Sequence, residues 1–361
     1  MKAIPAMKRP TIPIISTGNR RFLMRPSLSS DTAIPSPHVV PLPVIRKDTD
    51  RSQVNTNRLA ERSTYWLNNR AMWNSPITLR RPARQAAGIV LTSPHSGHNY
   101  PRAFLEASKL NETSIRSSED AFVDDLFGLA PALGLPMLAA EFPRAWCDAN
   151  REPWELDPSM FADKLPDYVN SASPRVAAGL GTVARIVGAG KPIYARKLYF
   201  HEAEQRIKQC WRPFHAALAG LIAECRSQFG HCLILDCHSM PSPVGRQDRQ
   251  TDIILGDGHG TTCAPALSAF IAANLSARGF TVSRNSPYAG GFITRYYGRP
   301  DEAVQTIQIE INRGLYMDER QMARKPTFAA MRERLGQFIQ DLASAGPIQG
   351  VSAPCFNEAA E

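Results

Sequence analysis

Short apolar runs alternate with longer amphipathic stretches along the chain from residue 88 to residue 343. The first run, Gly88-Ile89-Val90-Leu91-Thr92-Ser93, is short and rich in β-branched residues, which indicates a buried strand. Further strands are expected at 137–142, 232–237, 252–256, 280–284 and 304–312, and helices at 119–134, 175–187, 201–229, 263–278 and 327–343. This alternation predicts an α/β fold with a mixed, largely parallel central sheet flanked by helices.

The N-terminal sixty residues differ from the rest of the chain in composition and charge. They contain eight prolines and Phe22 as their only aromatic residue, too little apolar surface to offset the entropy of ordering. They also hold ten Lys and Arg residues against three Asp residues, so the remaining 301 residues carry only +2 of the net charge of +9. We therefore expect a disordered basic arm at 1–60, a catalytic domain at 61–345 and a flexible tail at 346–361.

Composition excludes several classes of protein. Hydrophobic residues at 43%, charged residues at 21% and a mean hydropathy of −0.26 are typical of a globular chain. The seven cysteines are too widely spaced for a disulfide framework, and no apolar run is long enough for a transmembrane helix or an export signal. A cytoplasmic protein without membrane association is expected. The nearly balanced charge of the main body also argues against a nucleic-acid partner.

Two histidines directly follow predicted buried strands: His95 after the strand at 88–93 and His238 after the strand at 232–237. In α/β sheets, ligands bind beyond the carboxyl ends of the strands. Imidazole is a common zinc ligand, and catalytic zinc usually has three protein ligands, often two His and one carboxylate. Asp120 and Asp124 are candidates for that carboxylate, since i, i+4 spacing on the predicted helix places two like charges on one face.

A cluster of basic and polar residues follows the predicted strand at 137–142. It contains Arg144, Asn150 and Arg151, and guanidinium groups near a strand end can bind a carboxylate through two parallel hydrogen bonds. The cluster therefore indicates a site for an acidic ligand.

The strand at 304–312 carries the best candidate for a catalytic carboxylate. Period-two alternation places Ile307, Ile309 and Ile311 on one face and the intervening polar residues, Glu310 among them, on the other. Burial of a carboxylate raises its pKa toward the range that suits a general base. Glu310 is thus predicted to be catalytic.

Five motifs, in order along residues 88–340, together resemble the N-formylglutamate amidohydrolase family. They are Ser93-Pro94-His95-Ser96-Gly97, Arg144 with Asp148-Ala149-Asn150-Arg151, Asp236-Cys237-His238-Ser239-Met240-Pro241, Asn285-Ser286-Pro287-Tyr288-Ala289-Gly290-Gly291-Phe292, and Gln308-Ile309-Glu310 before Tyr316-Met317-Asp318-Glu319. The family resembles zinc carboxypeptidases and aspartoacylase-like deacylases. This similarity implies a zinc carboxypeptidase-like fold, one Zn²⁺ per chain at the carboxyl edge of the sheet, and hydrolysis of an acyl-amide bond.

The resemblance also implies roles for individual residues. By position in the motifs, His95 and His238 correspond to the two zinc-binding histidines, and Asp120 corresponds to the third ligand. His98 and Asp124 remain alternatives for that third ligand.

The remaining roles concern catalysis and substrate binding. Glu310 corresponds to the general base, and Asn150 and Arg151 to an Asn-Arg pair that holds a substrate carboxylate. Arg144 is a further candidate for this carboxylate, and Arg295 is a candidate for a second one.

The sequence thus predicts a zinc-dependent amidohydrolase that acts on a small N-acyl amino acid, N-formyl-L-glutamate or a similar acidic substrate. One alternative is a serine hydrolase that uses Ser96 or Ser239. Another is a nucleic-acid-binding protein that acts through the basic arm. The acyl group, the amino acid and the oligomeric state stay open.

Overall fold

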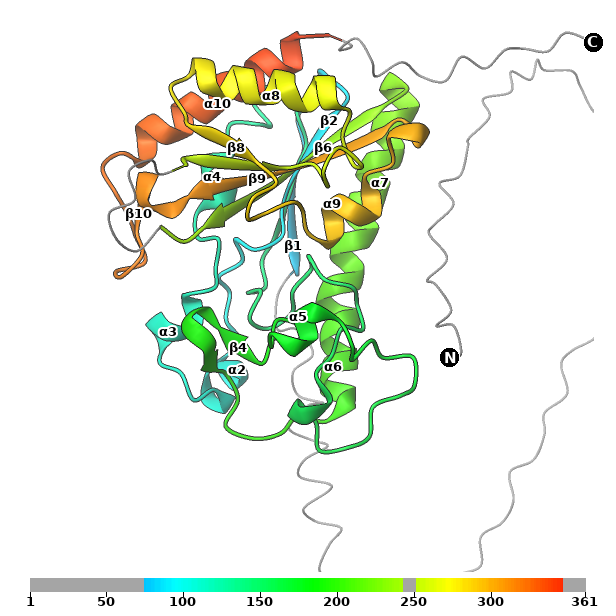
Figure 1. Cartoon of the computed structure of the whole chain (residues 1–361), viewed down its shortest axis with the longest axis vertical. Helices are drawn as coiled ribbons and strands as arrows, with labels where there is room; N and C mark the ends of the chain where they lie inside the picture. Colours follow the sequence, from blue (N-terminus) through cyan, green and yellow to red (C-terminus); the bar gives the residue numbers. More distant parts are fainter. Residues whose placement is uncertain (1–74, 243–250, 347–361) are drawn as a thin grey trace, which may run out of the picture. The chain divides into compact units, whose positions relative to one another are not determined.

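The computed structural model describes residues 75–242 and 251–346 (Figure 1). The expected arm at 1–60 lies outside these residues, as does all but the first residue of the expected tail at 346–361. The domain boundaries stay predictions.

A mixed seven-stranded sheet forms the centre of the described residues. Its strands, in sheet order, are β1 (Ile77–Arg80), β3 (Met137–Ala140), β2 (Ile89–Ser93), β6 (Cys232–Met240), β9 (Val304–Asn312), β7 (Ile253–Gly256) and β8 (Val282–Arg284). Strands β3, β2, β6 and β9 are mutually parallel, while β1 and β7 pair antiparallel with β3 and β9. Strand β8 runs parallel to β7. The predicted mixed, largely parallel sheet is confirmed.

Helices cover both faces of this sheet (Figure 1). The helices are α2 (Arg102–Ala107), α3 (Glu112–Arg116), α4 (Val123–Leu126), α5 (Pro174–Ala177), α6 (Phe200–Arg206), α7 (Arg212–Phe229), α8 (Pro265–Ala277), α9 (Phe292–Tyr297) and α10 (Phe328–Ser344). A π-helical segment, Ile207–Trp211, joins α6 to α7. Short 3₁₀ turns lie at Pro158–Met160, Gly188–Gly190, Pro300–Glu302 and Arg313–Leu315, and two small ribbons pair β4 (Ile186–Val187) with β5 (Lys191–Pro192) and β10 (Met317–Asp318) with β11 (Ala323–Arg324).

Alternation along the central strands separates the core from the polar residues of the sheet. Ile307, Ile309 and Ile311 of β9 are buried in the core formed with α4, α8 and α10. The intervening Gln308 and Glu310 point to the opposite face, where α9 packs against β9. The alternation expected for this strand is therefore confirmed, and it directs polar side chains to one side of the sheet edge.

The helix predicted at 119–134 is wrong over most of its length, because α4 spans only Val123–Leu126. Phe122 precedes it in the left-handed region at φ 66°, which interrupts a right-handed helix. The backbone N–H of Asp120 donates to the carbonyl of His95 (3.0 Å) and not within a helix. A tertiary contact thus replaces the expected helical turn.

The helix predicted at 175–187 is also wrong. Only α5 is helical there, and it ends before Gly179, which has a φ of 76°. The segment then forms β4 of a small ribbon.

One strand that carries a site residue ends later than expected, and one further strand was not predicted. Strand β6 continues through His238 to Met240, because its pairing with β9 extends to Asn312. His238 therefore lies within the strand and not after it. Strand β1 was not predicted, since an edge strand of four half-buried residues carries a weak pattern. Every helix in residues 75–242 and 251–346 is too short or too polar to cross a lipid bilayer.

A buried carboxylate organises the turn after β7. Asp257 accepts hydrogen bonds from Ser268 Oγ (2.6 Å), Arg284 Nη2 (2.5 Å) and Asn285 Nδ2 (2.7 Å). Burial opposes its ionisation, yet these hydrogen bonds lower the pKa of Asp257 to about 2. The network therefore fixes the start of the loop at 285–291.

Replacement of Asp257 by Ala is expected to lower the free energy of unfolding at pH 7 by about 1–3 kcal/mol, because its donors lose their acceptor. Since the folded pKa lies below the ordinary value of 3.8, this contribution is present above pH 4 and is lost as the pH falls toward 2. Urea unfolding at several pH values measures both effects. Asp341→Ala, which removes an exposed ion pair with Arg278, is the control and should change stability by less than about 1 kcal/mol. Equal losses in the two variants would contradict the prediction.

Candidate functional site

The carboxyl ends of three parallel strands bring the predicted catalytic residues together. His95 lies two residues beyond β2, His238 lies near the end of β6, and Glu310 lies near the end of β9. His238 and Glu310 are direct cross-strand partners in the β6–β9 register, so their side chains share one face. All three residues are buried.

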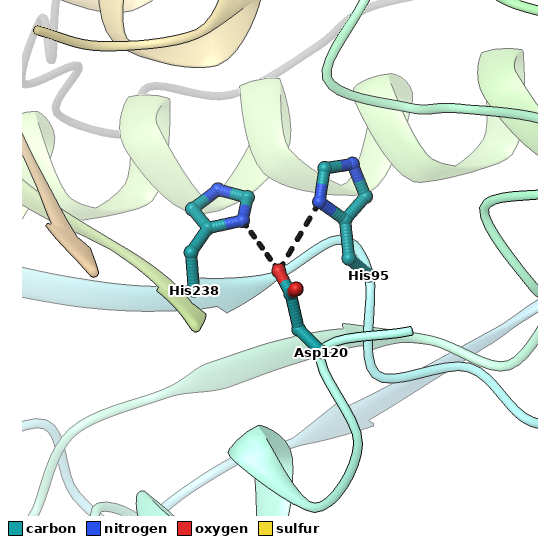
Figure 2. A group of neighbouring side chains, drawn as sticks. All are labelled: His95, Asp120 and His238. Atoms are coloured by element: carbon teal, nitrogen blue, oxygen red, sulfur yellow. Dashed lines mark hydrogen bonds and ion pairs between the residues drawn. The ribbon is translucent and has the colours of Figure 1, made fainter. Parts of the chain in front are cut away.

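Asp120 joins the two histidines (Figure 2). Its Oδ2 lies 2.9 Å from Nδ1 of His238 and 3.3 Å from Nδ1 of His95. The three residues are 1–2% exposed, and each offers one ligand atom within 4.8 Å of the others. Among the residues that the structure describes, these three form the group of His, Cys, Asp or Glu side chains that could hold a metal ion.

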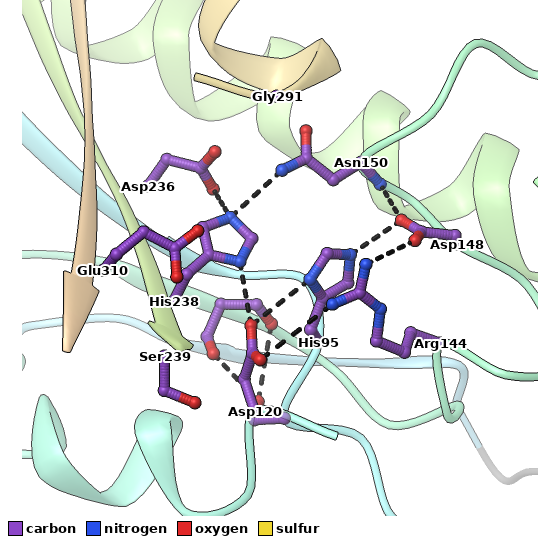
Figure 3. A network of polar contacts seen from close by, with 12 residues as sticks. His95, Asp120, Arg144, Asp148, Asn150, Asp236, His238, Ser239, Gly291 and Glu310 are labelled. Carbon is purple, nitrogen blue, oxygen red and sulfur yellow. Dashed lines mark hydrogen bonds and ion pairs between the residues drawn. The ribbon is translucent and has the colours of Figure 1, made fainter. Parts of the chain in front are cut away.

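A second carboxylate lies behind each imidazole (Figure 3). Nε2 of His95 lies 2.7 Å from Oδ1 of Asp148, and Nε2 of His238 lies 3.1 Å from Oδ1 of Asp236. Carboxylates in this position hold a ligating histidine in one orientation, with its other nitrogen free for a metal. Both histidines therefore have the surroundings typical of metal ligands.

Buried charges set the protonation of these acids. Burial opposes ionisation of Asp148, but Arg151, His95 and Arg144 hold its pKa well below the usual range. An ionised carboxylate only accepts hydrogen bonds, so the proton between His95 and Asp148 lies on Nε2 of the histidine.

Glu310 has the opposite shift. Burial is the main cause that raises its pKa, to about 7, and the charge of Asp120 adds to it while His238 and Arg144 oppose it. Gln308 Nε2 donates to Oε1 of Glu310 (2.7 Å) and leaves Oε2 without a partner among the described residues. A carboxylate with a pKa near neutrality is suited to accept and return a proton.

Two arginines complete the network around these acids. Arg313 Nη2 donates to Oδ1 of Asp120 (3.0 Å), and its Nε donates to Oγ of Ser239 (3.0 Å). Arg144 Nη2 donates to Oδ2 of Asp148 (2.9 Å). Each oxygen of Asp120 thus has its own partners: Arg313 at Oδ1 and the imidazoles at Oδ2.

A pocket of about 410 Å³ opens over this network, a volume suited to a small molecule. Its floor is formed by His95, Asp120, His238 and Glu310, and one wall comes from the loop that carries Tyr288. The lining residues of the other wall come from the segment around α5 and β4: Arg175, Leu180, Ala184, Ile186, Val187, Gly188 and Gly190.

The predicted substrate-binding residues differ in their placement. Arg144 and Arg151 line the pocket, although Arg151 also donates to the carbonyls of Leu180 and Asn150. Asn150 lines it as well, with its amide 3.1 Å from Nε2 of His238. Arg295 is exposed, donates to a backbone carbonyl, and is not among the lining residues.

The two alternative third ligands lie apart from the metal group. His98 is exposed, and within the described residues its imidazole contacts the carbonyl of Ser96 (3.4 Å). Asp124 pairs with Arg80 (3.3 Å) and does not share a helix face with Asp120. The geometry therefore favours Asp120 over both alternatives.

Sequence reasoning missed the contributions of Arg313, Asp148 and Asp236. Arg313 directly follows β9, and Asp236 lies two residues before His238 on the same face of β6, so strand position carried some signal for both. Asp148 lies in an irregular loop, and no local pattern indicates that its carboxylate reaches His95.

The chain is similar to known proteins in both sequence and structure. The sequence profile of the family described as N-formylglutamate amidohydrolase matches residues 87–317. An N-formylglutamate deformylase from Pseudomonas aeruginosa is 31% identical over 237 residues, which cover 64% of this chain and 82% of that protein. A second N-formylglutamate deformylase, from Pseudomonas putida, is 27% identical over 236 residues with the same two coverages.

Two solved structures are similar to this fold. The N-formylglutamate amidohydrolase of Ralstonia eutropha JMP134 matches with a TM-score of 0.71 and 35% identity, over 75% of this chain and 98% of that one. A gene product of Agrobacterium tumefaciens matches with a TM-score of 0.56 and 18% identity, over 75% of this chain and 96% of that one, which supports the fold alone. The resemblance stated from the five motifs is thus confirmed.

Close packing at Gly291 generates a prediction about the site. A methyl group there would overlap the amide of Asn150, which is held by the backbone N–H of Ile293 (2.8 Å) and lies against His238 (Figure 3). Gly291→Ala is expected to lower the free energy of unfolding by about 1–3 kcal/mol, the usual cost of overpacking. Gly220→Ala, in an exposed part of α7 with open space around the added carbon, is the control.

Thermal or urea unfolding of both variants checks this prediction. The control is expected to be neutral or more stable by up to about 1 kcal/mol, since Ala favours a helix more than Gly does. A Gly291→Ala variant as stable as the wild type would show that the Asn150 amide can move without cost.

Proposed function

The chain belongs to the N-formylglutamate amidohydrolase family and hydrolyses an amide bond, and from this premise we propose that it is a zinc-dependent deacylase of an acidic N-acyl amino acid. N-formyl-L-glutamate is the proposed substrate, in line with the names of the relatives. The observation that carries the proposal is one buried group: two carboxylate-backed histidines and Asp120, beside Glu310, on the floor of a pocket bordered by arginines.

The donor set fits a zinc ion. Nδ1 of His95 and Nδ1 of His238 lie 3.3 Å and 2.9 Å from Oδ2 of Asp120, so two nitrogen donors and one oxygen donor, ligand types that zinc takes, lie close together. The proton on Nε2 of His95, which faces Asp148, leaves Nδ1 of His95 free as a ligand, and a proton on Nε2 of His238 beside Asp236 would leave Nδ1 of His238 free in the same way. When bound, zinc supplies Lewis acidity, which polarises a carbonyl oxygen and lowers the pKa of water.

Glu310 serves as the proton carrier in the proposed reaction. Its carboxylate accepts a proton from water as the water oxygen bonds to the acyl carbon, and it returns the proton to the amine nitrogen as the C–N bond breaks. The products are a carboxylic acid and a free amino acid. The hydrogen bond from Gln308 holds one oxygen of Glu310, so the other oxygen carries the proton.

The arginines of the pocket supply charge for an anionic substrate. Arg144 and Arg151 line the pocket and provide planar donors for the α-carboxylate. Asn150 lies between Asp148 and His238: its backbone N–H donates to Asp148 (2.8 Å), and its side-chain amide lies 3.1 Å from Nε2 of His238.

The serine hydrolase alternative has less support from the geometry. Ser96 Oγ accepts a hydrogen bond from Ser93 Oγ (3.0 Å), and Ser239 Oγ accepts one from Arg313 Nε (3.0 Å). Within residues 75–242 and 251–346, neither serine side chain forms a hydrogen bond with a histidine, as an activated nucleophile would require.

Metal content tests the ligand assignment. Purified protein is expected to hold about one zinc per chain, and His238→Ala is expected to lose it because one of three ligands is removed. His201→Ala, on the exposed side of α6, is the control and should retain zinc. Elemental analysis measures the occupancy. Full occupancy in a His95→Ala, His238→Ala double variant would refute the assignment.

Glu310→Gln tests the proton carrier. This variant is expected to retain zinc but to lose at least about a hundredfold in kcat, the lower range for loss of a general base. Glu302→Gln, at a partly exposed residue paired with Arg299, is the control. Steady-state amine release measures the effect, and loss of zinc with Glu310→Gln would identify Glu310 as a ligand.

A substrate panel tests the function itself. Amine release is expected from N-formyl-L-glutamate, and it should stop after removal of the metal by a chelator and return on addition of zinc. Release that survives the chelator but stops with a serine-directed reagent would support the serine hydrolase alternative. If amine is released only from a different N-acyl amino acid, the proposed amide hydrolysis holds and N-formyl-L-glutamate is not the substrate.

A further inference from the structure

One arginine of the pocket has a guanidinium group that is unpaired among the residues that the structure describes. Arg175, in the first turn of α5, lines the pocket and is exposed. Among the described residues its side chain makes no hydrogen bond or ion pair, whereas Arg144 and Arg313 donate to Asp148 and Asp120. A guanidinium group in this position keeps its planar pair of donors available for a ligand.

The backbone holds Arg175 close to Arg151. Arg151 Nε donates to the carbonyl of Leu180 (2.8 Å), and the N–H of Leu180 donates to the carbonyl of Arg175 (2.8 Å). Two successive hydrogen bonds therefore connect the two arginines through Leu180. Their positive charges add in the same part of the pocket, which favours an anion there.

The electrostatic effect of Arg175 on its neighbours agrees with this position. Burial lowers the pKa of Arg151, and the charges of Arg144 and Arg175 add to that effect. Burial likewise lowers the pKa of Arg295, with Arg175 as the next cause. Repulsion among these guanidinium groups is relieved when a carboxylate binds between them.

The wall that carries Arg175 is otherwise apolar. Leu180, Ala184, Ile186 and Val187 line the pocket on the same segment. An apolar wall with a cation at one position matches a short methylene chain that ends in a carboxylate. Arg144, by contrast, lies 4.0 Å from Asp120 at the metal group.

We propose that Arg175 binds the side-chain carboxylate of an acidic N-acyl amino acid and selects it over neutral analogues. The role rests on the proposed function, and it replaces Arg295 as the residue for the second carboxylate. Arg295 donates to the carbonyl of Gly290 (2.7 Å) and does not line the pocket.

Discrimination between glutamate and glutamine compounds tests this role, since the two side chains have the same shape and differ in charge. The zinc-loaded full chain is titrated with the amine products L-glutamate and L-glutamine by calorimetry. Turnover of N-formyl-L-glutamate and N-formyl-L-glutamine is measured in parallel. The variants are Arg175→Gln, Arg175→Lys and Arg295→Gln, and Arg102→Gln is the control, with a side chain that is 91% exposed on α2.

Arg175→Gln is expected to weaken glutamate binding and kcat/KM for the formylated diacid at least about tenfold, as loss of charge-assisted hydrogen bonds requires. The affinity for L-glutamine and kcat/KM for N-formyl-L-glutamine should change less than about threefold. Arg175→Lys should fall between these limits, because an ammonium keeps the charge without the planar fork. The control should match the wild type.

Three outcomes would overturn the proposal. Equal losses for both ligands would make Arg175 a structural residue, and no loss for either would exclude it from the pocket's chemistry. Loss of discrimination in Arg295→Gln but not in Arg175→Gln would return the role to Arg295. Wild-type protein that releases no amine from either substrate would instead refute the proposed function, and the substrate role of Arg175 with it.

Discussion

The buried carboxylate of Asp120 is the contact on which the site depends. One of its oxygens accepts from Arg313, and the other faces the imidazoles of His95 and His238. Those partners come from the ends of β9, β2 and β6, so one carboxylate ties three strand ends together. A buried anion is stable only with such partners on both oxygens. The backbone at Asp120 is therefore not helical, because the side chain is held by these partners.

Two groups of charged residues surround that contact, one of carboxylates and one of arginines. Carboxylates surround the two histidines, where Asp148 from a loop and Asp236 from β6 back the imidazoles. Arginines also line the pocket. Arg144 is paired with Asp148, and the side chain of Arg175 is unpaired among the described residues. The negative charge of the carboxylates favours a metal cation, and the positive charge of the arginines favours an anionic substrate. One pocket can therefore hold both.

The fold could be predicted where burial alone determines structure. Strands β2, β6 and β9 were visible as apolar runs or strict alternation, because both faces of a central strand are covered. The helices expected at 119–134 and 175–187 failed for a common reason. Tertiary hydrogen bonds and residues with positive φ, Phe122 and Gly179, override a local helical pattern.

For the site, the sequence by itself determined the chemical types: two histidines and a glutamate near strand ends, with arginines in a following loop. Strand direction and alternation suffice for that, since they decide which side chains reach one edge of the sheet. Only the tertiary structure decided that Asp120 and not His98 or Asp124 meets the histidines, and that Arg175 and not Arg295 borders the pocket. These choices depend on loop paths, which follow from contacts between residues far apart in the chain and leave no periodic signal in the sequence.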